Sequence, residues 1–232
     1  MTVHMYGKPC NLINIQKICK KHKIGLIEDC AQAHGAKINN KYTGTFGEYG
    51  CFSFYPTKNL GCIGDGGAIM VNKKTENSIK KIRNYGSIIR YKNDILGVNS
   101  RLDEIQSIFL NIKLKSLNKI IKKKRSLARI YFERLKSDYI LPIIEKNKYD
   151  VFYIFNVRHP NRDKLRKYLF NNNIMTDIHY PVPPYKQKAL KGFFNKEYKI
   201  SDEIHNTTIS LPISFINSEN DIERICNIMN KF

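Results

Sequence analysis

One lysine in this sequence stands where it could do covalent chemistry. Lys58 follows the apolar segment 50–54 and a short turn, and Asp29 ends another apolar segment, residues 24–29. A lysine amine forms a Schiff base with an aldehyde, and a carboxylate can keep a pyridine nitrogen protonated so that the ring withdraws electrons. An amine and a carboxylate at the ends of neighbouring strands are therefore what pyridoxal phosphate chemistry requires.

The elements that must position these two residues read as alternating strands and helices. A strand, a helix and a strand in this order predict a parallel pair with a right-handed crossover. Ser100 is expected to cap a long helix that runs to about Leu135. The sequence predicts strands at residues 2–6, 24–29, 49–54 and 68–71, a hairpin at residues 37–44, and helices at residues 11–23 and 75–84.

The pattern of apolar and polar residues changes near Leu141 and Pro142. Beyond that point the patterns predict strands at residues 151–157, 174–178 and 209–211, and helices at residues 162–171, 201–206 and 220–229. We therefore expect an α/β chain of two domains, a large one at residues 1–140 that includes the long helix and a small C-terminal one at residues 141–232.

Seven short motifs stand in the order found in one known family. They are VHMYG at 3–7, IEDCAQAHGA at 27–36, GTFG at 44–47, FSFYPTKNLG at 52–61, GDGGA at 64–68, GVNSRLDEIQ at 97–106 and HYPVPP at 179–184. Together they resemble the DegT/DnrJ/EryC1/StrS family of sugar aminotransferases over nearly the whole chain. The resemblance implies a fold-type I pyridoxal-phosphate transferase whose large, mostly parallel sheet domain lacks the family's N-terminal part.

The resemblance assigns roles to residues of the large domain. Lys58 corresponds to the Schiff-base lysine, which also shuttles a proton during transamination. Asp29 corresponds to the partner of the pyridine nitrogen, although a strand-end carboxylate that caps a turn is the alternative. Gln32 resembles the residue that contacts the cofactor ring oxygen, and Ser53 resembles a phosphate ligand.

Three further expectations concern the subunit interface, the substrate and the histidines. Asn99 resembles an asparagine that reaches the cofactor phosphate of a neighbouring subunit, which implies a homodimer; a plain turn residue is the alternative. His179 and Tyr180 belong to the family's substrate segment, and Tyr185 stands where the family often has a second histidine. We expect His4 to be structural, and we expect His34 to be a structural hydrogen-bonding residue rather than a proton shuttle.

The implied reaction moves an amino group, with glutamate as the expected donor, onto a keto group of a nucleotide-linked deoxysugar. The motifs look most like those of members that act on dTDP-3-keto-6-deoxyhexoses, which feed the synthesis of surface polysaccharides or related glycans. Two alternatives stay open, because the missing N-terminal part would also suit an inactive remnant or one half of a split enzyme.

Composition limits the other classes of protein. The formal charge of +20 raises the possibility of a nucleic-acid-binding module, but the basic residues are spread over every segment and no binding motif accompanies them. No run approaches the ~20 apolar residues of a membrane span, and the N-terminus lacks the pattern of a signal peptide, so we expect a cytoplasmic protein without membrane contact. None of the six cysteines forms a CxxC pair, which favours free thiols and no metal site.

Overall fold

The computed structural model describes all residues from 1 to 232, and they divide into two compact units. The first unit comprises residues 1–121 and 146–153, and the second comprises residues 122–145 and 154–232. The division therefore differs from the expected boundary at residue 140. It falls within the long helix, because residues 146–153 return to the first unit and pair with a strand there.

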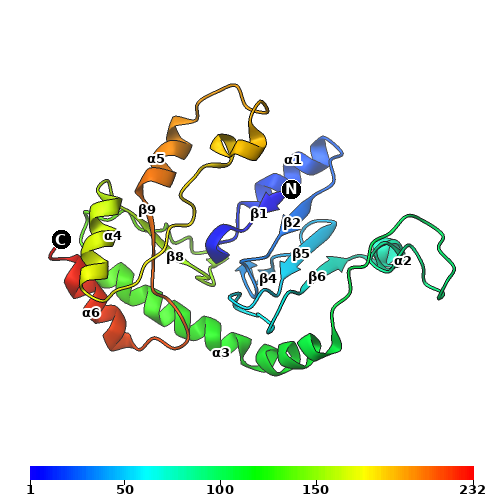
Figure 1. Ribbon diagram of the computed structural model, residues 1–232, viewed down its shortest axis with the longest axis horizontal. Coiled ribbons are helices and arrows are strands. Elements are labelled where there is room, and N and C mark those ends of the chain that lie inside the picture. The colour runs from blue at the N-terminus through cyan, green and yellow to red at the C-terminus, as the bar shows by residue number, and fades with distance from the viewer. The chain divides into compact units, whose positions relative to one another are not determined.

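A four-stranded sheet forms the centre of the first unit (Figure 1). Its order is β1 (Thr2–Val3), β2 (Ile27–Asp29), β5 (Tyr49–Ser53) and β6 (Gly67–Val71). The pairs β1·β2 and β2·β5 are parallel, which confirms the predicted parallel arrangement, whereas β6 runs antiparallel to β5. The three parallel strands therefore end at one edge of the sheet, where Asp29 and Ser53 are the last strand residues.

The helices of the first unit begin close to the predicted positions, with one exception. Asn11 caps α1 (Leu12–Lys21) and Asn72 caps α2 (Lys73–Ile82), each by accepting backbone N–H groups of the first turn. The long helix α3 (Glu104–Arg134) begins four residues after Ser100. The prediction of Ser100 as its cap is wrong, because Ser100 instead donates its backbone N–H to the carbonyl of Arg83 at 2.9 Å.

The predicted hairpin is confirmed as β3 (Lys37–Ile38) and β4 (Lys41–Tyr42). Its two central residues, Asn39 and Asn40, have φ values of 48° and 63°. Asparagine tolerates this left-handed region better than most residues, which makes it suited to a tight two-residue turn. Strand β7 (Lys148–Tyr149) adds to the other side of β3 and completes a small antiparallel sheet.

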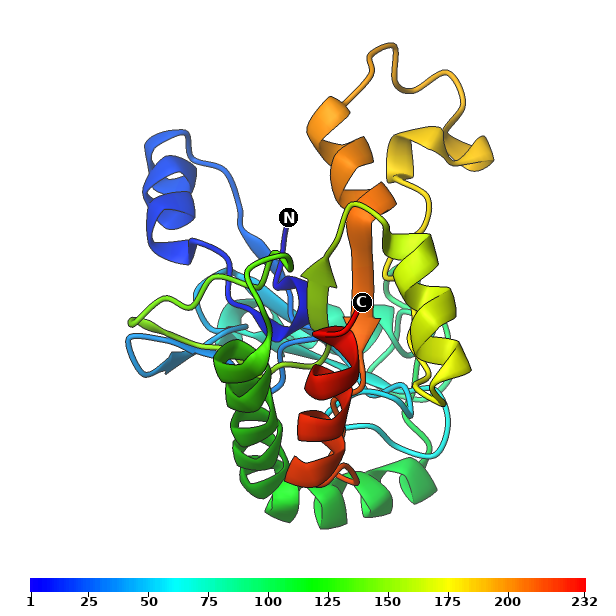
Figure 2. The same ribbon diagram turned by 90° about the vertical axis from the view of Figure 1, so that its left-hand side faces the viewer.

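The second unit has its own core around an antiparallel pair, β8 (Phe155–Arg158) and β9 (Thr208–Leu211). Helix α4 (Arg162–Asn171) packs against β9 and α6 (Glu219–Met229), as Figure 2 shows in yellow-green, orange and red. The remaining helical elements of the chain are α5 (Lys199–Thr207) and the 3-10 turns η1 (Met5–Gly7), η2 (Pro184–Lys186) and η3 (Lys188–Leu190). The predicted strand at 174–178 is reduced to a single bridge between Asp177 and Ser210.

Strand β6 is apolar in sequence but largely exposed in the structure. Its apolar sequence predicts burial on both faces, yet Ile69 is 48% exposed and Met70 is 49% exposed. The neighbouring helix α2 has no buried residue. This edge of the sheet therefore presents apolar surface to solvent. No helix of the chain combines the length and the apolar character that crossing a membrane requires.

Candidate functional site

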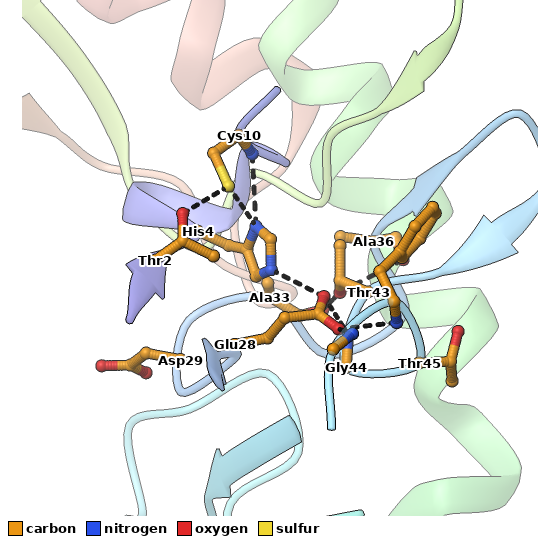
Figure 3. A network of polar contacts seen from close by, with 12 residues as sticks. Thr2, His4, Cys10, Glu28, Asp29, Ala33, Ala36, Thr43, Gly44 and Thr45 are labelled. Carbon is orange, nitrogen blue, oxygen red and sulfur yellow. Dashed lines mark hydrogen bonds and ion pairs between the residues drawn. The ribbon is translucent and has the colours of Figure 1, made fainter. Parts of the chain in front are cut away.

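Two predicted site residues project from the same face of the parallel strands. The register pairs Asp29 of β2 with Cys51 of β5, and the alternation of a strand places Ser53 on the face of Cys51. Glu28 lies on the opposite face and is fully buried. The sheet thus brings a carboxylate and a hydroxyl to one face at one edge, while the adjacent carboxylate points the other way (Figure 3).

Asp29 stands at the end of β2 with part of its side chain exposed. Its Oδ1 accepts the backbone N–H of Ala31 at 3.0 Å, so the carboxylate does cap the turn that follows the strand. A carboxylate can accept about four hydrogen bonds, so a turn contact through one oxygen leaves it able to accept from another donor. Turn capping and a role toward a bound group are therefore compatible for Asp29.

Gln32 holds the turn after β1 in place. Its Oε1 accepts the backbone N–H of Tyr6 at 2.5 Å, and Tyr6 adopts a positive φ of 61° within η1. Because the carbonyl end of the amide faces Tyr6, its amino end is directed away from that turn. The amino end is the part of Gln32 that could donate to a ring oxygen.

Lys58 lies beside an aromatic ring that the sequence did not indicate. Its Nζ is 4.7 Å from the centroid of the Tyr153 ring, within the range of a cation–π interaction. The hydroxyl of Tyr153 lies 3.2 Å from Oγ1 of Thr57, which fixes the ring next to the lysine turn. Tyr153 is 95 positions away along the chain, and only the return of residues 146–153 to the first unit brings it here.

The turn between β5 and Lys58 is held by local bonds. Ser53 Oγ accepts the N–H of Tyr55 at 3.3 Å, and the N–H of Lys58 donates to the carbonyl of Tyr55 at 2.9 Å. The next residue, Asn59, is buried and donates from Nδ2 to the carbonyl of Val151 at 3.4 Å. Ser53 and Lys58 are therefore presented by one anchored turn.

Asn99 is exposed in the loop before α3 and is held by its own neighbours. It bridges to Asn84 through the backbone, and its Oδ1 accepts the Nε–H of Arg101 at 3.0 Å. These contacts fit a turn residue, and they leave the predicted reach to a neighbouring subunit untested.

The three predicted substrate residues all belong to the second unit. His179 Nδ1 lies 2.9 Å from Oγ of Ser210, and the carbonyl of Tyr180 lies 2.5 Å from a ring nitrogen of a histidine in α5. The hydroxyl of Tyr185 donates to Asp202 at 2.5 Å. His179 and Tyr185 thus have partners on β9 and α5, which fix the segment that carries the HYPVPP motif.

The face of β2 opposite Asp29 carries a buried polar network centred on Glu28 (Figure 3). Glu28 Oε1 accepts the N–H groups of Phe46 and Gly47 at 2.6 and 2.7 Å, and Oε2 accepts that of Gly44 at 2.7 Å. His4 Nε2 lies 3.2 Å from the same Oε2. Burial would raise the pKa of Glu28, but His4 and the three backbone N–H groups outweigh it and lower the pKa. The expected structural role of His4 agrees with this arrangement.

His4, Glu28 and Cys30 bring a nitrogen, an oxygen and a sulfur within 4.8 Å of one another, a donor set that metal ions use. However, both oxygens of Glu28 already accept two hydrogen bonds each. A metal ion would have to displace these donors, so the arrangement is better explained as a polar tie between β1, β2 and the turn at residues 43–47.

His34 does not behave as the hydrogen-bonding residue that the sequence predicted. It is only 3% exposed, and its ring centroid lies 5.5 Å from that of Phe52 and 5.9 Å from that of Phe54. Neither ring nitrogen makes a hydrogen bond of normal geometry, and the nearby backbone of Ser53 only partly offsets the effects that lower the pKa of the ring. Burial, together with the positive charge of Lys58, lowers the pKa of His34 to about 4. His34 is therefore a neutral ring beneath the lysine turn.

The fold belongs to the α/β class, with a mostly parallel sheet that ends in Asp29 and Ser53. Sequence comparison then identifies the family. The model of the DegT/DnrJ/EryC1/StrS aminotransferase family matches residues 1–230. The chain belongs to this family, which confirms the expected family and the α/β fold.

Individual relatives agree with this assignment. The chain is 44% identical over 234 residues to the dTDP-3-amino-3,6-dideoxy-α-D-galactopyranose transaminase of Aneurinibacillus thermoaerophilus, covering 100% of this chain and 64% of the relative. It is 36% identical to a UDP-N-acetyl-3-dehydro-α-D-glucosamine 3-aminotransferase of Acidithiobacillus ferrooxidans, covering 99% of this chain and 63% of the relative.

Among solved structures, DesV of S. venezuelae in complex with a ketimine intermediate superposes with a TM-score of 0.95 at 34% identity. The match covers 99% of this chain and 63% of that one. An aminotransferase of the same family from Brucella abortus also gives a TM-score of 0.95, at 30% identity and with the same coverage. The chain thus spans a little less than two thirds of the relatives that it matches.

Proposed function

We propose that this chain is the cofactor-binding part of a pyridoxal-phosphate-dependent transaminase that acts on a nucleotide-linked keto-deoxysugar. The observation that carries the proposal is the group Asp29, Ser53 and Lys58 at one edge of the parallel sheet. The relatives named as sugar transaminases support the substrate class. A dTDP-3-keto-6-deoxyhexose as acceptor and glutamate as donor are the specific pair that we propose.

The residues at this edge fit the cofactor chemically. Asp29 would keep the pyridine nitrogen protonated, the amino end of Gln32 would donate to the ring oxygen, and the Ser53 hydroxyl would donate to the phosphate. Lys58 would hold the cofactor through Nζ. The bound cofactor supplies an electron-withdrawing ring, which makes the hydrogen on the amino-bearing carbon acidic.

The side chains of the protein then manage the proton and the approach of the substrate. Once released from the cofactor, the Lys58 amine can take a proton at Nζ and return it at the neighbouring carbon. The Tyr153 ring face lies close enough to stabilise the ammonium form of that amine. His179, Tyr180 and Tyr185 of the second unit are the residues that we propose to line the sugar site.

Chemical trapping tests the assignment of Lys58. The protein is incubated with pyridoxal phosphate, reduced with borohydride and digested, and we expect the label on Lys58. Lys41 offers a matched control, since its Nζ also lies over an aromatic ring, 4.5 Å from the centroid of Phe46. Lys58→Arg should abolish the label and Lys41→Arg should leave it unchanged. A label spread over the exposed lysines of residues 113–124 would contradict the proposal.

We also propose that the active unit is a homodimer in which Asn99 reaches the neighbour's cofactor phosphate. Asn99 is exposed and lies on a loop, as a residue that crosses an interface would. Sedimentation of the cofactor-loaded protein should show a dimer, and Asn99→Ala should weaken cofactor retention. A monomer that still transaminates contradicts this part of the proposal.

The exposed apolar edge favours a second reading, in which the 232 residues act together with a further chain segment. Ile69 and Met70 on β6 are about half exposed, so covering them would add roughly half of the ~1.5–3 kcal/mol that full burial of such a side chain contributes. We expect the 232-residue chain alone to bind hydrophobic dyes and to retain the cofactor poorly. Adding the part of the relatives that this chain does not cover, fused or as a separate chain, should reverse both. Full activity of the 232 residues alone would exclude the split or remnant alternatives.

A further inference from the structure

The buried network on the far face of β2 ends in a cysteine that the proposed transamination does not use. Cys10 is half-buried, and its Sγ lies 2.8 Å from Oγ1 of Thr2 and 3.5 Å from Nδ1 of His4. Figure 3 shows the Cys10 sulfur, the His4 ring and the Glu28 carboxylate in sequence, with the ring between the other two. A thiol, an imidazole and a carboxylate in this order are the arrangement that activates cysteine nucleophiles.

The imidazole is held in one orientation. His4 is fully buried, its Nε2 faces Glu28 at 3.2 Å, and Glu28 is fixed in turn by the three backbone N–H groups of the turn at residues 44–47. The other nitrogen, Nδ1, therefore faces Cys10. Nδ1 lies 3.2 Å from the backbone nitrogen of Cys10 and 3.5 Å from its sulfur. In the neutral ring its single lone pair accepts the backbone N–H, and it can exchange that bond for the thiol proton.

The charges of the cluster favour transfer of that proton. Burial raises the pKa of the Cys10 thiol, but the hydrogen bonds from His4 and Thr2 outweigh it and lower the pKa. Burial likewise lowers the pKa of His4, but Cys10, Cys30 and Glu28 overcome this effect and raise it to about 11. The opposite shifts stabilise a thiolate next to an imidazolium.

We propose that Cys10 is a nucleophilic thiol, oriented and activated by His4 and Glu28, and that it is a site of reversible modification by small disulfides. The Cys10 proton moves to Nδ1 of His4, and the sulfur attacks one sulfur of the incoming disulfide. A new S–S bond forms to Cys10 while the original S–S bond breaks. The departing thiolate leaves with the electron pair and takes a proton from His4 or from water.

Cys30 also lies against His4, but burial outweighs that contact and raises the pKa of its thiol. Burial and the nearby Asp29 raise the pKa of Cys51, which is half-buried like Cys10 and therefore serves as an internal reference. Cys19, also half-buried, lies on α1. The fully buried thiols are Cys30, Cys62 and Cys226. We therefore expect selective reaction at Cys10.

The test is a limited reaction of the 232-residue protein with 4,4′-dithiodipyridine between pH 6 and pH 8, followed by peptide mass spectrometry. At pH 6.5 we expect Cys10 to react at least about tenfold faster than Cys51, because the thiolate is the attacking species. The three buried thiols should stay unreacted until denaturant is added, which verifies that the protein is folded. Cys10→Ser should remove the fast phase, and Cys19→Ser should not.

Two variants assign the activation to the neighbours of Cys10. Thr2→Val removes the hydroxyl from the edge of β1 and should slow Cys10 by a few-fold at pH 6.5. His4→Gln should slow it by about tenfold and restore a steep increase with pH. The titratable group that faces Cys10 is His4, and Glu28 and Cys30 lie against His4 in turn.

Two outcomes would overturn the proposal. One is a Cys10 rate no higher than that of Cys51, or a Cys10 rate unchanged in both variants. The other is a rate that rises only after a chelator is added, because it would show that the cluster of His4, Glu28 and Cys30 holds a metal ion. We expect the chelator to have no effect.

Discussion

Two buried histidines of the first unit have opposite properties. His4 is fully buried and His34 is 3% exposed, so burial alone would disfavour the charged form of both. Yet the pKa of His4 is raised to about 11 by Cys10, Cys30 and Glu28, which outweigh its burial, whereas burial and Lys58 lower the pKa of His34 to about 4. The partners of a buried imidazole, rather than its depth, decide its charge.

The two histidines link stability to pH with opposite signs. His4 binds its proton more tightly in the folded state, so its contribution is fully present below pH 6.5 and is lost as the pH rises toward 11. His34 binds its proton more weakly in the folded state. Its contribution is present above pH 6.5 and is lost as the pH falls toward 4.

Among the substitutions considered, Glu28→Gln should lower the free energy of unfolding the most. The substitution removes the anion that faces the buried His4 ring and turns an amide nitrogen toward backbone donors, which leaves polar groups unpaired. Breaking a buried pair in this way costs roughly 3–5 kcal/mol. Urea denaturation at pH 7 measures the loss. The matched control is Glu48→Gln, an exposed carboxylate, which should change stability by less than about 0.5 kcal/mol.

His34→Leu should remove the buried imidazole whose pKa is lowered. A pKa of about 4 in the folded state against 6.5 unfolded makes His34 cost roughly 3 kcal/mol of stability between pH 6.5 and pH 4. The variant should lack that part of the acid sensitivity and should be equal to or more stable than the natural protein at pH 7.5, since no hydrogen bond of normal geometry is lost. Urea midpoints across pH 4–8 test this, and an unchanged pH profile would refute it.

A smaller effect is expected at Thr43. Its hydroxyl lies 3.2 Å from the carbonyl of Ala33 and 3.4 Å from that of Ala36 (Figure 3), two residues that flank His34 in the sequence. Thr43→Val should cost about 1 kcal/mol without changing the shape of the pH profile. Thr45→Val, in the exposed part of the same turn, is the control and should be nearly neutral. A changed profile would indicate that the two histidine sites are coupled.

The smallest effect is expected at His22, an exposed histidine that ends α1. His22→Gln should shift the free energy of unfolding by no more than about 0.5 kcal/mol at pH 7. The same urea titrations measure it. A larger shift at His22 than at His34 would break the comparison, because an exposed ring without partners should contribute less than a buried one.

Local sequence patterns predicted many of the strands and helices that position the site residues. The two-residue period of a strand is enough to put Glu28 and Asp29 on opposite faces, as the structure shows, because it depends only on neighbouring residues. The Asn39–Asn40 hairpin and the order of strands and helices were also readable for the same reason. The start of α3 and the strand at 174–178 were not predicted correctly, because contacts with residues far away in the chain decide where those elements begin or end.

The candidate site was predictable only in part. The motifs around Lys58 and Asp29 identified both residues, but Tyr153 carried no signal because its place beside Lys58 depends on the return of residues 146–153 to the first unit. The boundary between the two units was displaced for the same reason. The exposure of β6 could not be predicted from the sequence, because an apolar strand has the same sequence pattern whether or not another element covers it.

The sequence by itself determined the family, the residue types at the strand ends and the faces on which they lie, because these follow from motifs and from the two-residue period of a strand. The tertiary structure alone decided that His4 is charged and His34 neutral, and that Cys10 lies against a histidine. Charge states depend on distances between groups that are far apart in the chain and on how much water reaches them, and only the folded protein sets both.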